Sequence, residues 1–538
     1  MVKGTVDPAS VSRPRYRLIV EKDIEIPMRD GLSLKCDIFR PDDPGRFPII
    51  MTLGPYPKDE HIDYGDKAEE CGPYMHWETA NPQWWVPRGY IEIRVDSRGT
   101  GASPGFSDIL SRQESEDYYD SIEWAAQQPW SSGNVGLMGI SYFAVNQWNV
   151  AGLDPPAFEG DDCMGRRGDL YRDSTHNGGI LHDGFFGFWY RTRVVERTLG
   201  SNPPNWRQQF SPFFDQLQDD DLDGPFYREW TAHWDQVKVP LLSVGNWGNR
   251  EIHLRGNTEG FMRAASKDKR LRIHTGTHIG PFYRLEGRLD QIRYFDYWLK
   301  GIENGLPNDP PVKLAIRTGP DQEEWRFENE WPLARTVWTK FHLDARNGSL
   351  GPKAPAANGK IAYSAAGPRT DAFRGARFLS EPFAENTEIT GPVALVLWVS
   401  STVDDMDIFA ALHVIDPDGK EVLFPNGQNE PSAASKGWLR VSHLKLDPAL
   451  SKPWRPYHRH DEVQKLTPGE PVEAQLEIIP TSNVVRKGYR LRVDVLPWDD
   501  NPKTLYSHDN RVNQRGENTV HSGDGRESYL LLPVIPPG

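Results

Sequence analysis

One serine stands in a setting that can make it a nucleophile. The apolar run Val135–Met138 is too short for a helix of its own and predicts a buried strand. Gly139 and Ser141 follow at once, and the residues beyond them can continue as a helix. A serine on such a sharp strand-to-helix turn, G-x-S-x-G, exposes its hydroxyl for attack on a carbonyl carbon. The match is partial, because Phe143 occupies the position of the second glycine.

A nucleophilic serine also needs a base, a group that orients the base and donors for an oxyanion. His278 is the candidate base, because it follows the predicted strand Leu271–His274 and precedes an amphipathic helix. The loop after the predicted strand Val239–Val244 should carry an acid, but it offers Asn249, with Glu251 as the nearest carboxylate. An amide can accept the imidazole N–H, although it stabilises an imidazolium less well than a carboxylate. The orienting group is therefore left open between Asn249, Glu251 and an acid of another loop.

Two further patterns resemble ligand sites. Gly99–Gly105 follows a strand as a dinucleotide loop would, but its third glycine comes one residue late and Pro104 interrupts the helix start. His458 and His460 have metal-ligand spacing, but they lack a third partner and are better explained by a solvated loop. The sequence therefore predicts no cofactor and no metal.

The elements around the candidate residues have an α/β pattern up to about residue 315. Short strands alternate with helical segments, which is typical of a mostly parallel sheet. Residues 16–150 and 236–315 are predicted to form this domain in two parts. Residues 151–235 lack strands of the same type, are rich in Asp, Gly, Phe and Trp, and predict an inserted helical cap.

The last part of the chain changes character. From about residue 312 helices nearly vanish and short alternating segments dominate, which predicts an all-β sandwich, a jelly roll, over residues 316–538. Residues 345–370 are loaded with Gly, Ala, Pro and Lys and are predicted to be a linker.

Composition limits the function classes. The chain has 538 residues and a net charge of −14, which argues against a nucleic-acid surface. No apolar run approaches the roughly 18 residues that span a bilayer, and no signal peptide is expected from the first residues. Three distant cysteines, Cys36, Cys71 and Cys163, fit a reducing, cytoplasmic compartment. A small-molecule substrate is expected, and a homodimer is left open.

Five motifs together carry a family resemblance that extends over nearly the whole chain after residue 16. They are Pro55–Lys58, Asp96–Gly105, Asn134–Tyr142 with Trp148, Val239–Trp247, and Pro480–Ser482 with Lys487–Leu491. In type and order these motifs resemble the CocE/NonD family of serine hydrolases, which is related to cocaine esterase and the X-Pro dipeptidyl peptidases.

The resemblance implies an α/β-hydrolase domain, an inserted helical cap and a C-terminal jelly roll. It also implies an elbow of the form G-x-S-Y, so that Phe143 is expected, and an oxyanion hole made by the Tyr56 hydroxyl and the Tyr142 N–H. Loss of one such donor typically lowers the rate about 10²–10³-fold. The departure from the family is Asn249, where relatives carry Asp.

The first hypothesis is thus a serine hydrolase that cleaves an ester or an amide of a bulky, apolar group through an acyl-enzyme on Ser141. His278 would relay the proton, and Asn249 or Glu251 would orient it. An alternative on the same fold is non-hydrolytic acyl transfer or lyase/cyclase chemistry with a modified triad. A binding protein built on an inactive hydrolase is a third hypothesis.

Overall fold

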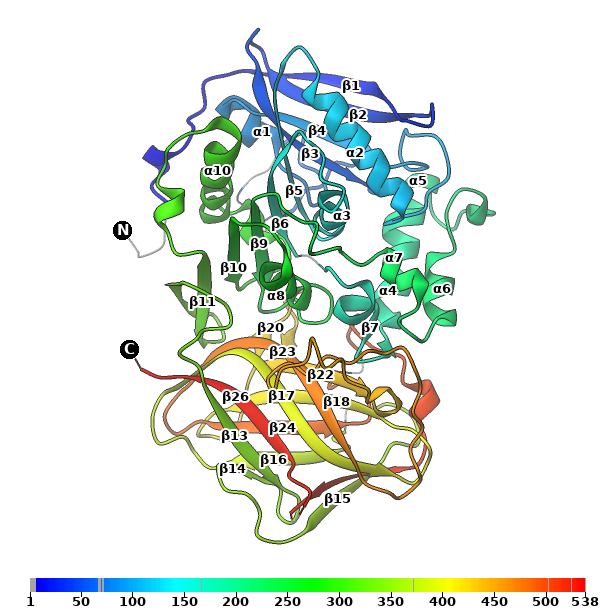
Figure 1. Cartoon of the computed structure of the whole chain (residues 1–538), viewed down its shortest axis with the longest axis vertical. Helices are drawn as coiled ribbons and strands as arrows, with labels where there is room; N and C mark the ends of the chain where they lie inside the picture. The colour runs from blue at the N-terminus through cyan, green and yellow to red at the C-terminus, as the bar shows by residue number, and fades with distance from the viewer. Residues whose placement is uncertain are drawn as a thin grey trace.

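The computed structural model describes residues 6–65, 69, 72–165, 167–370, 372–501, 503–523 and 525–537. An α/β domain and an all-β domain are stacked along the long axis, and a helical segment lies beside their junction (Figure 1). No helix in these ranges is long and apolar enough to cross a membrane. Cys36 is a buried free thiol, whereas Cys71 and the side chain of Cys163 lie outside the described residues.

The α/β domain is built on a sheet of ten strands within the described residues, ordered β1-β2-β4-β3-β5-β6-β9-β10-β11-β12. Its central strands are parallel, and antiparallel strands lie at both edges. The strands are β1 (Leu18–Pro27), β2 (Ser33–Pro41), β3 (Phe47–Gly54), β4 (Ile91–Asp96), β5 (Ser131–Ile140), β6 (Phe158–Met164), β9 (Leu241–Asn246), β10 (Lys269–His274), β11 (Val312–Gly319) and β12 (Gln322–Glu328).

Helices cover both faces of this sheet, which explains why its central strands β3, β4 and β9 are buried at every position. Alternate residues of β3 separate into two cores: Met51 packs with α2 (Arg112–Ala126), and Ile50 packs with α10 (Leu285–Lys300). Helices α3 (Tyr142–Ala151) and α8 (Leu254–Arg263) follow β5 and β9. The predicted mixed α/β domain is therefore confirmed.

A helical insertion, residues 165–240, separates β6 from β9. It contains α4 (Asp183–Trp189), the π-helical turn η5 (Tyr190–Val195), α6 (Phe213–Asp219) and α7 (Pro225–Glu229). The prediction that residues 151–235 lack sheet strands is wrong for β6, which lies between β5 and β9. Asp161 and Asp162 gave this strand a polar pattern, although both side chains are buried.

The all-β domain is a closed barrel. Its twelve strands within the described residues run almost wholly antiparallel, and β26 returns to pair with β17. They are β13 (Val337–Asp344), β14 (Ser349–Gly351), β15 (Gly359–Ser364), β16 (Ala376–Ser380), β17 (Thr387–Ser401), β18 (Asp407–Ile415), β19 (Glu421–Val422), β22 (Ser435–Arg440), β23 (Val472–Val485), β24 (Arg490–Leu496), β25 (Glu517–Ser522) and β26 (Tyr529–Ile535).

Two of the predicted boundaries, the start of the all-β domain and the linker, differ from those in the structure. The all-β domain does not begin at residue 316, because β11 pairs with β10 and β12 extends the first sheet to Glu328. Residues 345–370 are not a linker, since β14 and β15 are strands of the barrel sheet. The connection between the domains instead lies between β12 and β13.

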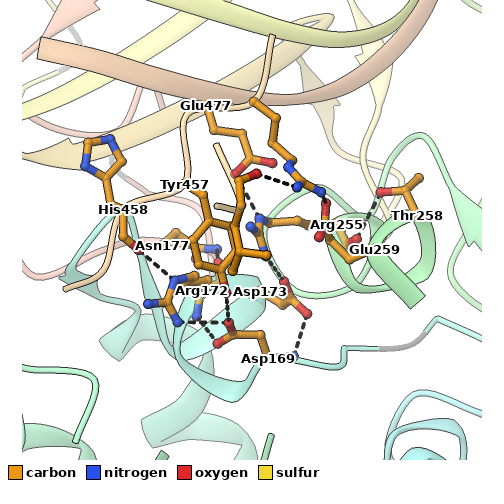
Figure 2. A network of polar contacts seen from close by, with 12 residues as sticks. Asp169, Arg172, Asp173, Asn177, Arg255, Thr258, Glu259, Tyr457, His458 and Glu477 are labelled. Atoms are coloured by element: carbon orange, nitrogen blue, oxygen red, sulfur yellow. Dashed lines mark hydrogen bonds and ion pairs between the residues drawn. The ribbon is translucent and has the colours of Figure 1, made fainter. Parts of the chain in front are cut away.

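A network of buried charges joins the insertion, the α/β domain and the barrel (Figure 2). Arg255 of α8 pairs with Asp173 of the insertion at 2.6 Å and with Glu477 of β23 at 3.0 Å. We call this cluster the interdomain network; its labelled members are Asp169, Arg172, Asp173, Asn177, Arg255, Thr258, Glu259, Tyr457, His458 and Glu477.

Candidate active site

Ser141 lies on the sharp turn between β5 and α3. Its backbone has φ 57° and ψ −116°, a strained conformation for a residue with a side chain. The turn is held by two main-chain hydrogen bonds: the Ser141 N–H donates to Met164 O at 2.9 Å, and the Ile140 N–H donates to Glu78 O at 3.0 Å. This is the geometry of a nucleophile elbow.

Phe143 fits the elbow because neighbouring positions are glycines. A Cβ on Gly54, at the end of β3, would lie 2.6 Å from the Phe143 ring, and one on Gly139 would lie 2.4 Å from the Phe143 Cβ. The space that a second glycine of the motif would leave is therefore provided by Gly54.

His278 and Asn249 are brought together at the carboxyl ends of β10 and β9. The Asn249 Nδ2 lies 2.7 Å from the His278 Nδ1. A loop of the barrel domain fixes both residues: the His278 N–H donates to Gly427 O at 2.8 Å, and Asn249 packs so closely on Gly427 that no Cβ would fit there. Glu251 is not brought to His278; it is buried and pairs with Lys436 at 3.5 Å.

A second histidine, His253, contacts the serine directly. Its Nε2 lies 3.3 Å from the Ser141 Oγ. Its ring stacks on that of His278 at 5.3 Å between centroids, with 4° between the planes. The His253 Nδ1 is buried without a hydrogen-bond partner among the described residues, and burial lowers the pKa of His253 well below its ordinary value. His253 is thus held as a neutral imidazole.

A buried carboxylate, Glu78, faces the other side of His278. Its Oε1 lies 3.1 Å from the His278 Nε2. Glu78 has φ 59° and is only 3% exposed, and burial raises its pKa, an effect that the hydrogen bond to His278 opposes. His278 is therefore bracketed by an amide at Nδ1 and a carboxylate at Nε2.

The predicted oxyanion donors both lie beside the elbow. The Tyr56 ring is 6.0 Å from that of Tyr142, and its hydroxyl accepts a hydrogen bond from the Trp189 Nε1–H at 2.8 Å. Because that bond uses a lone pair, the Tyr56 proton stays available, and no acceptor for it is present among the described residues. The Tyr142 N–H is at the first position of α3, where amides have no partner within the helix.

Sequence reasoning missed His253 and Glu78. His253 is four residues beyond Asn249, in the same loop, so a search of that loop for every imidazole could have found it. Glu78 lies in a stretch without periodicity and is held at the site by main-chain hydrogen bonds with Ile140 and the Tyr64 hydroxyl.

The two ligand-like patterns have other roles. In Gly99–Gly105 the Ala102 amide donates to the carboxylate of Asp96 at 2.7 Å. The turn therefore binds a carboxylate of the protein itself. The prediction that His458 and His460 lie in a solvated loop is wrong. Both side chains are buried between the barrel and the insertion. The described residues contain no cluster of three or more potential metal ligands.

Family models match both halves of the chain. The model of the X-Pro dipeptidyl-peptidase S15 family matches residues 30–280, and that of the X-Pro dipeptidyl-peptidase C-terminal non-catalytic domain matches residues 304–531. The first match contains every site residue described above.

Similar proteins agree with these matches. Cocaine esterase of Rhodococcus sp. (strain MB1 Bresler) is 24% identical, with 96% of this chain and 98% of that protein covered. The crystal structure of a CocE/NonD family hydrolase from Staphylococcus aureus superimposes with a TM-score of 0.90 at 31% identity, over 96% of this chain and 94% of that one. An alpha-amino acid ester hydrolase shares the fold, with a TM-score of 0.72 at 18% identity over 98% of both chains. The chain belongs to the CocE/NonD family and is a serine hydrolase.

Proposed function

We propose that the enzyme cleaves a carboxylic ester or amide through an acyl-enzyme on Ser141. One observation carries the proposal: a strained serine whose Oγ lies 3.3 Å from an imidazole nitrogen, on a turn that packs against the Tyr56 ring through Tyr142 and Phe143. Such a serine can attack a carbonyl carbon while two donors receive the oxyanion.

His278 is the general base in this proposal. In the resting structure the Ser141 hydroxyl contacts His253, but His253 has no partner at Nδ1 to orient its ring or stabilise its charged form. His278 has a partner on each side and stacks directly on His253. Hydrogen bonds of catalytic groups are often poorly aligned before substrate binds. For the relay, the Asn249 amide would turn so that its Oδ1, which has no partner among the described residues, accepts the Nδ1–H of His278. The Nε2 lone pair of His278 would then take the proton of the Ser141 hydroxyl as the hydroxyl shifts away from His253. The resulting Nε2–H would face Glu78.

Glu78 supplies the charge that Asn249 cannot. In a serine triad the acid orients the imidazole and stabilises the imidazolium. Asn249 provides the first function at Nδ1 of His278, and the Glu78 carboxylate, 3.1 Å from the same ring, provides the second. The two tasks of one aspartate are thereby divided between two residues.

Tyr56 and the Tyr142 N–H stabilise the tetrahedral intermediate, after which the leaving group takes the proton from His278. Water then attacks the acyl group on Ser141 by the same steps in reverse. We further propose that the helical insertion is the cap, that its aromatic residues Phe186 and Trp189 form one wall of the pocket, and that the barrel is a jelly roll. A small molecule whose ester or amide carries a bulky, largely apolar group fits these surroundings.

The test compares the wild type with Ser141→Ala on 4-nitrophenyl butyrate, together with labelling by a fluorophosphonate probe. The wild type should release 4-nitrophenol and take up one probe at Ser141, and the variant should do neither. A wild type that labels but transfers its acyl group only to an added alcohol would favour acyl transfer. Equal hydrolysis by the variant would end the proposal.

A further inference from the structure

Arg167 is a buried cation in the loop that follows β6, the strand next to the elbow. The loop is held at both ends: the Gly165 N–H donates to Val244 O at 2.9 Å, and the Gly168 N–H donates to the Asp173 Oδ2 at 2.8 Å. The residue is 7% exposed, and its guanidinium lies 5.4 Å from the centroid of the Phe186 ring, in α4 of the insertion. Arg167 is thus fixed where the α/β domain meets the insertion.

The charge of Arg167 has no counterion among the described residues. Its one side-chain hydrogen bond goes from Nη1 to the Ser174 hydroxyl at 3.3 Å, and its Nε is buried with no partner in the described chain. Asp173 is the acid that influences Arg167, but its Oδ1 pairs with Arg255 at 2.6 Å and its Oδ2 accepts the Gly168 and Asp169 amides. Burial accordingly lowers the pKa of Arg167 to about 10.

Most other buried arginines have closer partners, although Arg250 also lacks an ion pair among the described residues and donates only to Trp247 O and Ala434 O. Arg172 and Arg440 each lie within 3 Å of a carboxylate oxygen. Arg317 has no ion pair among the described residues, but it donates to Ser482 O, Ala434 O and the Thr481 hydroxyl. A buried charge without a partner is costly, because it has lost its hydration and gained nothing in return. Such an unpaired buried charge is expected where a bound ligand supplies the missing counterion.

The free guanidinium belongs to the active site. Its loop borders the two stacked imidazoles, since a Cβ on Gly165, two residues before Arg167, would lie 3.4 Å from the rings of both His253 and His278. Phe186, on which the guanidinium lies, packs at 6.0 Å against Trp189, the hydrogen-bond partner of Tyr56. A substrate group beside Arg167 would therefore be part of a molecule bound at Ser141.

We propose that Arg167 binds a carboxylate of the substrate, so that the enzyme prefers esters with a negative charge a few bonds from the scissile carbonyl; this rests on the proposed function. A carboxylate is the group that a guanidinium binds best, through two parallel N–H···O bonds. The surrounding aromatic rings exclude water from this pair and accept the apolar part of the substrate.

The experiment uses two matched pairs of esters that differ only in charge. The first pair is 4-nitrophenyl hydrogen adipate and its methyl ester, with the charge on the acyl side. The second is 4-acetoxybenzoate and its methyl ester, with the charge on the leaving group. The readout is the ratio of kcat/KM for the anionic member to that for the neutral member, at pH 7.5.

The wild-type ratio should exceed one in at least one pair, and Arg167→Gln should lower it by about 10- to 100-fold, as loss of a hydrogen bond to a charged group does. Arg167→Lys should lower it less, because the charge remains. Arg317→Gln, which removes another buried arginine without an ion pair, should not move the ratio.

Two results would overturn the inference while leaving the hydrolase intact: a wild type that prefers the methyl ester in both pairs, or a ratio that Arg167→Gln does not change. If Arg167→Gln does not fold, the wild type and Arg167→Lys decide by the same ratio. Failure of the wild type to hydrolyse any of the four esters would count against both the proposed function and this inference.

Discussion

The interdomain network and the active site both bury arginines and carboxylates, but they treat their charges differently. In the network every arginine has a carboxylate close by: Arg172 lies 2.9 Å from Asp169, and Arg255 bridges Asp173 and Glu477 (Figure 2). In the active site Arg167 has no carboxylate among the described residues, and the His253 Nδ1 and Asn249 Oδ1 are buried without partners there.

The difference separates two uses of buried polarity. Paired charges cost little once both partners are in place, and they fix how three parts of the chain pack. Unpaired polar atoms cost stability in the resting protein, and such a cost persists where it serves binding or catalysis. The comparison therefore predicts that loss of an arginine costs much more stability in the network than in the active site.

The largest effect should separate the two stacked histidines. His278→Gln should lower kcat at least about 10³-fold, because it removes the proton relay. His253→Gln, whose amide can still hold the Ser141 hydroxyl, should lower kcat by less than about 10-fold. Steady-state kinetics with 4-nitrophenyl butyrate measure both. A reversed order would make His253 the base.

The same substitution should cost much more stability in the interdomain network than in the active site. Arg255→Met should lower the free energy of unfolding by about 3–5 kcal/mol, because it leaves the buried Asp173 and the partly buried Glu477 without their cation. Arg167→Met should cost about 1 kcal/mol or less, since it removes a charge that is already unpaired. Urea unfolding followed by tryptophan fluorescence makes the comparison.

A control for this pair lies on the surface. Arg515 pairs with Asp404, and both side chains are about half exposed. Arg515→Ala should cost less than about 1 kcal/mol, as exposed pairs usually do. Equal losses for Arg255→Met and Arg167→Met would remove the distinction between the two regions.

A smaller effect should appear when Glu78 loses its charge. Glu78→Gln should lower kcat/KM about 10-fold and flatten its acid limb, because a glutamine cannot take up the proton whose binding inactivates the wild type. In the wild type, activity should fall as the pH drops through the raised pKa of Glu78. Asn249→Asp adds a carboxylate on the other side of the ring and should move the limb to higher pH. An unchanged limb in Glu78→Gln would limit Glu78 to a structural role.

The sequence predicts this molecule well where local pattern decides the structure. Apolar runs locate most strands of both domains, and order along the chain selects Ser141, His278 and Asn249 as candidate site residues. The sequence pattern does not reveal strand β6, because Asp161 and Asp162 are buried polar residues within a sheet. Whether a charge finds a counterion depends on side chains far apart in the chain, so neither Glu78 at His278 nor the unpaired Arg167 could be read from spacing.

The central claim is an acyl-enzyme on Ser141, and trapping it is the most direct test. The wild type is mixed with a 4-nitrophenyl ester, quenched with acid within the first turnover and analysed by mass spectrometry of its peptides. The account predicts that the peptide with Ser141 gains the mass of the acyl group and loses it at the rate of turnover. Turnover without acylation of Ser141, or with acylation of another residue instead, would contradict it.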